Sequence, residues 1–253
     1  MRVAEIFRSL QGEGRLTGVE SIFVRSSGCN LRCGYCDTPY ASWSPEGTDL
    51  PLETIAEQIE CLRQQPSPKH LDVVRTSEPT LPPAPTPVPR HVVLTGGEPM
   101  LFPDLVPLTN LLHDRGWHIT IETSGTLYLP VHCNLMSISP KLSNSTPIDA
   151  SDPGWAARHE QRRHTPEVIE RLITEHDYQL KFVVDRLDDC KEIERWLSEF
   201  PMVAKQHVMV MPQGTTRETV AGKVAWLVDY CAARGFTFCP RRHIEWFDSR
   251  RGH

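Results

Sequence analysis

The sequence predicts an α/β protein in which helices cover a mostly parallel sheet. Short β-rich runs alternate along the chain with longer segments whose apolar residues recur at helical spacing. Repeated βα units with right-handed crossovers give either a doubly wound sheet or a barrel. At 253 residues the chain can bury a substantial core, and a barrel of this length is usually one domain. We therefore expect residues 1–253 to form a single domain.

Six short apolar segments are the predicted strands. They show little strict alternation, which is typical of a parallel sheet covered by helices. They span residues 21–27, 91–95, 118–123, 134–139, 178–185 and 206–211. In a barrel and in a doubly wound sheet alike, ligands gather at the carboxyl ends of the strands. We expect functional residues at or just beyond these ends.

Five longer segments follow the 3.6-residue period and are the predicted helices. They span residues 52–65, 104–116, 165–176, 187–200 and 216–235. Gly116 and Gly235 stand where helix C-caps belong. The segment 66–89 breaks the pattern, because it holds eight of the 22 prolines and proline favours extended, solvated backbone. We interpret residues 66–90 as a surface insertion, either a spacer loop or a proline-rich docking site for a partner.

Composition limits the partners and the compartment. The formal net charge of −5 gives no global basic field, so we expect no direct contact with nucleic acid. No apolar run reaches 18 residues, and the first residues lack the long apolar stretch of a signal peptide. We therefore expect a cytoplasmic protein, with no membrane contact and with reduced thiols.

Five of the eight cysteines have simple interpretations. A chain of this length in a reducing compartment is not expected to pair its thiols in disulfides. Cys190 and Cys231 fall among apolar residues at helical spacing, which predicts packing in the core. Cys61, Cys133 and Cys239 form no closely spaced thiol motif in the sequence, and we assign them no chemistry.

The other three cysteines form the pattern C-x3-C-x2-C, at Cys29, Cys33 and Cys36. A structural zinc site needs four closed ligands, so a zinc-thiolate module would require a distant fourth ligand. A four-iron cubane held by three thiolates keeps one open iron, which points to chemistry rather than charge storage. Gly28 and Gly34 let the backbone approach the sulfur atoms. Both interpretations stay open on these residues alone.

With Tyr35 before the last cysteine, the motif resembles that of the radical S-adenosylmethionine (SAM) superfamily. The resemblance implies a trimmed barrel with parallel strands and outer helices. It implies a 4Fe-4S cluster on Cys29, Cys33 and Cys36 whose open iron binds the amino and carboxylate groups of SAM. An electron from the cluster then splits the sulfonium and gives a 5′-deoxyadenosyl radical. A donor of the flavodoxin or ferredoxin type must supply that electron.

Further stretches take SAM-binding roles through this resemblance. Thr95–Pro99, TGGEP, follows a predicted strand and looks like the superfamily's GGE motif. The segments 139–141 and 211–214 likewise end predicted strands. We expect Glu122 and the hydroxyl groups that follow it to contact the ribose or the substrate, or else only to cap the end of their strand. The implied SAM-binding residues are Tyr35, Cys36, Asp37, Gly97, Glu98, Ser139, Pro140, Lys141, Met211, Pro212, Gln213 and Gly214.

The stretch LQGEG at residues 10–14, the run G-x4-F-x-R-x2-G-C ending at Cys29, and Asp37-Thr38 resemble the 7-carboxy-7-deazaguanine synthases. In isolation LQGEG would be a glycine-rich hairpin turn. The family converts 6-carboxy-5,6,7,8-tetrahydropterin into 7-carboxy-7-deazaguanine with loss of ammonia, on the route to queuosine and related deazapurines. It uses SAM catalytically with the help of Mg²⁺, and it usually forms homodimers.

This second resemblance assigns the substrate side of the site. Arg25 offers a fork that matches the substrate carboxylate, and Thr38 matches the position that contacts Mg²⁺. The implied substrate-binding residues are Leu10, Gln11, Gly12, Glu13, Arg25, Thr95 and His243. We assign no substrate contact to residues 245–253, although the family's chain terminus often makes one.

One rival from the same superfamily is an activating enzyme for glycyl-radical proteins. It would share the three cysteines and the GGE motif, but it would act on a protein backbone. Gln11, Arg25 and Thr38 favour a small carboxylated ligand instead.

Overall fold

The computed structural model describes residues 1–68, 71, 74, 90–148, 154–248 and 251–252. Within them, nine strands form one sheet in the order β3-β1-β2-β4-β5-β6-β7-β8-β9. The strands are β1 (Arg2–Leu10), β2 (Glu20–Ser26), β3 (Thr48–Asp49), β4 (His91–Gly96), β5 (His118–Thr123), β6 (Leu135–Ile138), β7 (Tyr178–Val184), β8 (Val208–Pro212) and β9 (Thr237–Phe238). No described helix is long and apolar enough to span a bilayer.

Helices join most of the parallel strands. They are α1 (Pro39–Ser42), α2 (Leu52–Gln64), α4 (Leu105–Asp114), α5 (Gly154–Arg162), α6 (Pro166–Glu175), α7 (Leu187–Ser198), α8 (Arg217–Arg234) and α9 (Arg242–Phe247). Three 3-10 turns, η1 (Pro99–Leu101), η2 (Ser143–Ser145) and η3 (Lys205–His207), complete the described elements.

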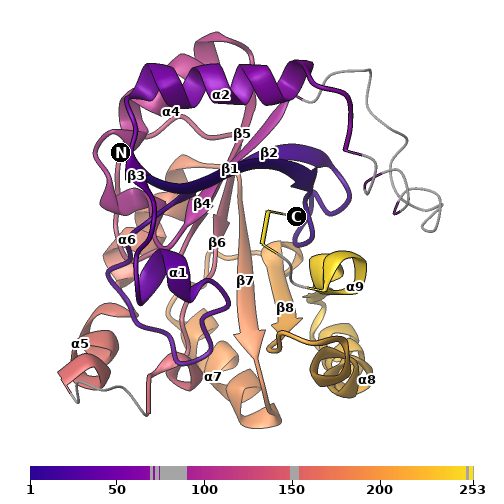
Figure 1. Cartoon of the computed structure of the whole chain (residues 1–253). Coiled ribbons are helices and arrows are strands. Elements are labelled where there is room, and N and C mark those ends of the chain that lie inside the picture. Colours follow the sequence, from indigo (N-terminus) through magenta and orange to yellow (C-terminus); the bar gives the residue numbers. More distant parts are fainter. Residues whose placement is uncertain (69–70, 72–73, 75–89, 149–153, 249–250, 253) are drawn as a thin grey trace.

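The strand order identifies the architecture as a partial barrel. β2 pairs in parallel with β4, and from β4 to β9 each strand pairs in parallel with the next along the chain, whereas β1 pairs antiparallel with β2 and β3. Because the order of the parallel strands never reverses, right-handed crossovers place the helices on one face. Figure 1 shows the curved sheet with α2 and α4 above it and α6, α7 and α8 around it. The trimmed barrel is confirmed, and the doubly wound alternative is wrong.

The two faces of the sheet have different chemistry. On the outer face, apolar side chains pack with the helices into the main core. These side chains include Ile22, Val24, Val92, Leu94, Ile119, Ile121, Met136, Ile138, Leu180, Phe182, Val184, Val208 and Val210. The positions between them point inward, and many are polar, such as Arg25, Thr95, Glu122 and Lys181. The strands therefore alternate, and helices cover only one face, contrary to our expectation from the apolar runs.

All six predicted strands and all five predicted helices are present, with ends within two residues of the predicted ones. Gly116 and Gly235 adopt the left-handed backbone of C-caps, with φ of 73° and 72°. Cys190 and Cys231 are buried, as predicted. All eight cysteines are free thiols.

Strand β1 is the main element that the sequence analysis missed. Its charged residues Arg2, Glu5 and Arg8 recur every third position, which does not fit the alternation of a strand. The register with β2 shifts between Val3 and Glu5, and such a bulge breaks the period of two. The predicted turn at residues 10–14 lies in the connection between these two antiparallel strands.

The proline-rich insertion at 66–90 lies largely outside the described residues. Two of its residues, Leu71 and Val74, are described and buried. They form a small apolar cluster with Leu10 and Phe247. The beginning of the insertion therefore packs against the end of β1 and against α9.

Phe182, on the outer face of β7, is a direct test of the core. It is fully buried, and its ring meets Trp196 of α7 edge to face at 5.1 Å. We expect Phe182→Ala to lower the free energy of unfolding by about 3–5 kcal/mol through the lost burial and the cavity. Anaerobic urea unfolding followed by circular dichroism measures this change. Met202→Ala, at an exposed position, should change the same quantity by less than about 0.5 kcal/mol.

Candidate active site

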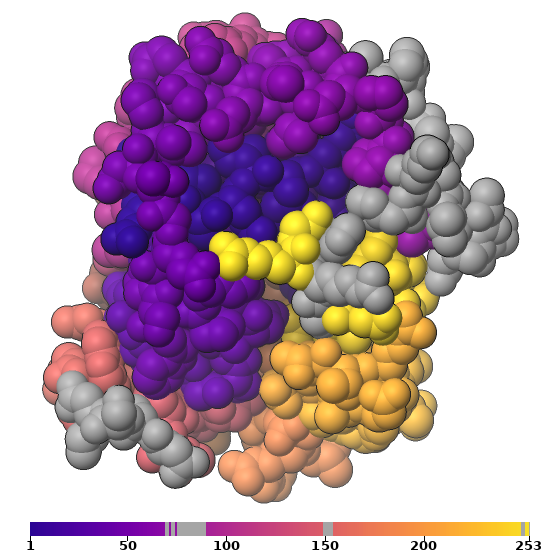
Figure 2. Space-filling view, in the orientation of Figure 1, coloured from indigo at the N-terminus to yellow at the C-terminus, as the bar shows by residue number. Residues whose placement is uncertain are grey.

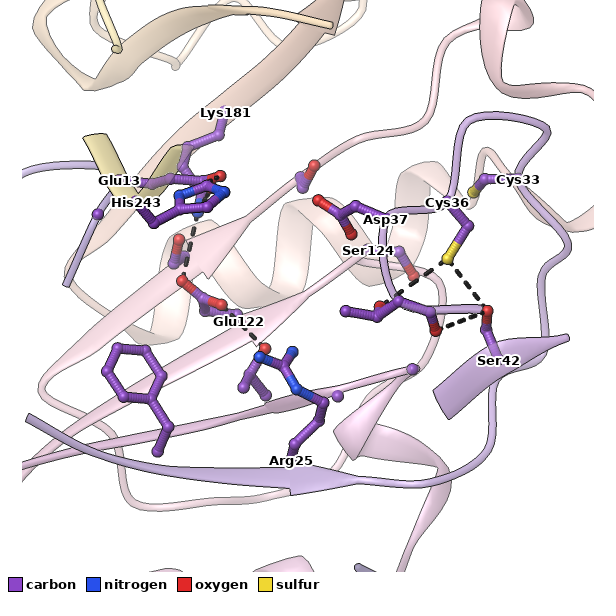
Figure 3. A pocket seen from close by; sticks show the side chains of 18 of the residues that line it. Glu13, Arg25, Cys33, Cys36, Asp37, Ser42, Glu122, Ser124, Lys181 and His243 are labelled. Atoms are coloured by element: carbon purple, nitrogen blue, oxygen red, sulfur yellow. Dashed lines mark hydrogen bonds and ion pairs between the residues drawn. The ribbon is translucent and has the colours of Figure 1, made fainter. Parts of the chain in front are cut away.

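A cavity of about 300 Å³ lies inside the open barrel. Its wall combines the inner face of the sheet, the cysteine loop (residues 27–38), the turn after β1 and the end of the chain (Figure 3). Seventeen of the predicted site residues line it. They are Leu10, Gln11, Gly12, Glu13, Arg25, Cys29, Cys33, Tyr35, Cys36, Asp37, Thr38, Thr95, Gly97, Ser139, Lys141, Met211 and His243.

Hydrogen bonds hold the cysteine loop against α1, against Trp43 just after α1, and against η2. The Gly28 amide donates to Ala41 O at 2.9 Å, and the Gly34 amide donates to Ser145 O at 2.8 Å. The Trp43 indole donates to Cys33 O at 3.0 Å. These bonds fix a loop that carries three thiols on the pocket wall.

The three thiols suit a cluster better than a single ion. Burial raises the pKa of Cys29 to about 12 and that of Cys33 to about 11, so both hold their protons until a metal displaces them. Among the described residues, no three His, Cys, Asp or Glu side chains converge on one ion. Zinc needs such convergence, whereas a cubane binds each thiolate through a different iron. The zinc interpretation is therefore disfavoured.

The GGE segment lies beside this loop. A Cβ atom at Gly97 would lie 2.2 Å from Gly28 O, so only glycine permits this approach. Gly96 has φ of 141° and would meet Ser26 O at the same distance. The glycine pair therefore lets the end of β4 pack against the end of β2 and the cysteine loop.

Glu98 is fully buried and does not line the cavity. Its carboxylate accepts hydrogen bonds from Thr123 Oγ1 at 2.8 Å, from Ser124 N at 2.8 Å and from Ser124 Oγ at 2.6 Å. In this structure it joins the ends of β4 and β5. Pro140, Pro212, Gln213 and Gly214 also lie outside the cavity lining.

Tyr35 indicates that this part of the pocket wall binds a polar ligand. Its ring packs with Val183, Met209, Met211 and Cys239. Its hydroxyl is buried and makes no hydrogen bond within the described part of the chain. A buried donor without a partner is costly, and a polar ligand would satisfy it.

At the other end of the pocket, paired charges gather around Lys181 (Figure 3). Its ammonium lies 3.0 Å from Glu13 and 3.3 Å from Glu122. Burial alone lowers the pKa of Lys181, but the two carboxylates outweigh it and raise that pKa above the usual value. For Glu13 the directions are opposite: burial raises the pKa of its carboxyl group, but Lys181 and Arg241 lower that pKa far more. Both groups therefore stay charged at neutral pH.

Glu122 occupies the middle of the wall. It accepts from Gln11 Nε2 at 3.1 Å and from Thr95 Oγ1 at 2.9 Å, in addition to Lys181. It thus joins β5 to β4, β7 and the turn after β1. Of the two interpretations for this residue, the structure disfavours a plain cap.

Arg25 points into the cavity from β2. Its Nε donates to Glu5 at 2.7 Å, and the Tyr40 hydroxyl donates to the same Glu5 oxygen at 2.8 Å. The two terminal nitrogens of Arg25 make no hydrogen bond within the described residues. They remain available to an anion in the cavity.

Two arginines and one histidine close the pocket from the C-terminal part of the chain. Arg241 forms ion pairs with Asp37 of the cysteine loop and with Glu13, and its Nη1 donates to Gly214 O at 2.5 Å. His243 lies 3.7 Å from Glu13, and its pKa is lowered chiefly by burial. Arg251 reaches Glu5 at 3.5 Å and Glu46 at 2.8 Å. Figure 2 shows the yellow C-terminal residues lying across the indigo and violet N-terminal part.

Sequence reasoning missed several of these residues. Lys181 gave a usable signal, because a lysine within the apolar run YQLKFVV is buried only when it is paired. Arg241 lies two positions before His243, which we predicted as a substrate contact. Arg251 and Gly252 also line the cavity, although we assigned that segment no contact. Their positions depend on how the chain end folds back, which local pattern does not reveal.

Comparisons with known proteins agree with this site. The sequence profile of the Radical SAM superfamily matches residues 23–187. The chain is 40% identical to the 7-carboxy-7-deazaguanine synthase of Rhodopirellula baltica, over 99% of this chain and 88% of that protein. It is 37% identical to the synthase of Halobacterium salinarum, over 98% and 91% of the two chains.

A solved structure agrees over almost the whole chain. The crystal structure of QueE from Escherichia coli superimposes with a TM-score of 0.61 at 26% identity, covering 96% of this chain and 94% of that one. The profile, the two relatives and the thiol-lined pocket agree with one another. The chain belongs to the 7-carboxy-7-deazaguanine synthase family of the radical SAM superfamily.

Proposed function

We propose that this radical SAM lyase converts 6-carboxy-5,6,7,8-tetrahydropterin into 7-carboxy-7-deazaguanine and releases ammonia, in the synthesis of queuosine and related deazapurines. The observation that carries the proposal is the pocket itself. It contains a three-thiol loop and, opposite that loop, a wall of paired carboxylates, amides and one arginine whose terminal nitrogens make no hydrogen bond among the described residues. Such a wall suits a flat, polar heterocycle that bears a carboxylate.

Cys29, Cys33 and Cys36 would hold the 4Fe-4S cluster, and SAM would bind between the cysteine loop and the strand ends. When bound, the cluster and SAM supply a radical that takes a hydrogen atom from the substrate. Gly97, Ser139, Lys141 and Met211 lie on the pocket wall and are the proposed SAM contacts, together with Tyr35, Cys36 and Asp37. Five predicted SAM contacts lie outside the cavity lining, namely Glu98, Pro140, Pro212, Gln213 and Gly214. They would support the lining residues without touching SAM themselves.

The substrate would lie between Arg25 and the Glu122 wall. Arg25 would bind the carboxylate through its terminal nitrogens, while Glu5 keeps its Nε oriented. Gln11, Glu13, Thr95 and His243 would meet the heterocycle, with Leu10 and Gly12 providing the surface beside them. Because burial keeps His243 neutral, it can both donate and accept.

Thr38 would contribute one oxygen to Mg²⁺. A single hydroxyl is a poor magnesium site, so the substrate and water must supply the other ligands. We also propose, from the family resemblance, that the chain acts as one domain within a homodimer in the cytoplasm. A flavodoxin- or ferredoxin-type protein would supply electrons.

The decisive experiment is an anaerobic assay of the reconstituted protein with the carboxypterin, SAM and Mg²⁺. We expect formation of the deazaguanine and ammonia without any protein substrate. Cys29→Ala should abolish product and lower the bound iron, whereas Cys61→Ala, an exposed thiol outside the pocket, should leave both unchanged. Turnover that appears only when a glycyl-radical protein is added would support the rival activity instead.

Arg25→Ala tests the carboxylate site. We expect the KM for the carboxypterin to rise by about 10- to 150-fold, because a charge-assisted hydrogen bond contributes about 1.5–3 kcal/mol. The binding of SAM, measured by titration of the holoenzyme, should change little. Arg15→Ala, at an arginine outside the pocket lining that pairs with Asp177, is the matched control. Equal losses for substrate and SAM would remove this role from Arg25.

Gly97→Ala tests the packing that holds the cysteine loop. The new methyl group would lie 2.2 Å from Gly28 O and 2.5 Å from Ala41 O, so the loop must move. We expect a loss of about 1–3 kcal/mol in stability and less iron per chain after reconstitution. Gly222→Ala, on α8 with nothing within 4 Å of the added atom, should keep its iron. Full iron content in Gly97→Ala would show that the close approach is not needed.

A further inference from the structure

Three consecutive residues at the end of the short helix α1, residues 41–43, hold the cysteine loop. Ala41 and Trp43 bind the backbone of the loop through the hydrogen bonds described above. The residue between them binds a sulfur atom instead. Ser42 Oγ lies 3.0 Å from Cys36 Sγ, and Figure 3 shows this sulfur directed toward Ser42. Ser42 therefore contacts a predicted cluster ligand directly.

In the described part of the chain, this hydroxyl is the closest hydrogen-bond partner of any of the three sulfur atoms. Cys29 Sγ accepts from the Leu31 amide at 3.4 Å, and Thr38 Oγ1 lies 3.9 Å from Cys36 Sγ. The Ser42 residue is only 3% exposed, so water has little access to its hydroxyl. Replacing this one side chain would remove the closest polar contact of the sulfur ligands.

The hydroxyl of Ser42 has one proton and two acceptors within reach. They are Cys36 Sγ at 3.0 Å and Thr38 O at 3.3 Å. Thr38 O already accepts from the Ala41 amide at 2.9 Å. A Cys36 thiol can itself donate to Ser42, but a thiolate that binds iron has no proton to donate. With a cluster bound, the contact is a hydrogen bond only if Ser42 donates to the sulfur.

A hydrogen bond in this direction acts on the charge of the cluster. A hydrogen bond to a thiolate is charge-assisted, so it stabilises negative charge on the sulfur. One-electron reduction adds negative charge to the cluster and its ligands, and the bond is therefore stronger in the reduced state. Hydrogen bonds to the sulfur atoms are among the factors that set the reduction potential of an iron–sulfur cluster. Loss of the Ser42 hydroxyl should make the cluster harder to reduce.

We propose that Ser42 is a positioning residue that donates a hydrogen bond to the Cys36 thiolate and thereby raises the reduction potential of the 4Fe-4S cluster. This inference rests on the proposed function only in requiring a cluster on the three cysteines. It does not depend on the identity of the substrate.

The test is a redox titration of the reconstituted holoenzyme without SAM or substrate. Electron paramagnetic resonance of the reduced cluster gives the midpoint potential. Titanium(III) citrate is the reductant: each titanium ion loses one electron, the cluster gains one through a mediator dye, and no bond in the protein forms or breaks. The variant is Ser42→Ala. The matched control is Ser27→Ala, at another buried serine of the cysteine loop whose hydroxyl has no partner among the described residues.

We expect Ser42→Ala to lower the equilibrium constant for reduction about tenfold, which for one electron makes the midpoint potential about 59 mV more negative. Ser27→Ala should stay within about twofold of the wild type, because it removes no hydrogen bond to a sulfur atom. The iron content of each protein is measured alongside, so that a change in potential is separated from a loss of clusters.

Equal potentials in Ser42→Ala and Ser27→Ala would overturn the proposal. So would a loss of iron in Ser42→Ala with an unchanged potential in the clusters that remain, because Ser42 would then only support the loop.

If Ser42→Ala holds too little cluster to titrate, Ser42→Thr and Ser42→Val are compared instead. Their side chains have the same shape, and only threonine has a hydroxyl. We expect the lower potential in the valine variant, and equal potentials in the two would refute the role of Ser42. Absence of any 4Fe-4S cluster from the wild type would refute the proposed function as well, whereas a normal cluster with an unchanged potential would refute this inference alone.

Discussion

The pocket depends on the pairing of charges inside the barrel. An unpaired Lys181 would strongly destabilise the protein in this position, because moving an ammonium group out of water costs several kcal/mol of hydration free energy. Glu13 and Glu122 compensate it, and Arg241 compensates Glu13 in turn. Since Arg241 also pairs with Asp37, the network extends from β7 to the cysteine loop. The turn after β1, the strand ends and the approach to α9 are therefore held in one arrangement before any ligand binds.

This arrangement separates two tasks that a radical enzyme must perform. The cysteine loop is fixed mainly by backbone contacts, such as those of Gly28, Gly34 and Gly97. The opposite wall is fixed by side-chain pairs around Glu122. A substitution in the polar wall can thus alter recognition of the heterocycle while the thiol loop keeps its shape. The Glu98 carboxylate, buried between β4 and β5, joins the two regions.

Much of the fold could be predicted from the sequence because the parallel strands and their helices are strongly patterned. The cysteines, the GGE segment, Arg25 and Gln11 could be placed on one site because each follows or belongs to a recognisable motif. The bulge in β1 hid that strand, and α5 escaped because it buries chiefly a histidine. Lys181 and Arg241 become part of the site only when β7 and the chain end fold beside Glu13. Such long-range pairing leaves little trace in a local pattern.

Leu71 and Val74 change how the proline-rich stretch should be regarded. Both are buried against Leu10, whose other side faces the cavity, and against Phe247 of the last helix. A mere spacer would accept replacement by any linker of similar length. Replacement of the whole stretch would remove two apolar side chains that pack against Leu10, a residue of the cavity wall. Shortening it safely would require cutting beyond residue 74.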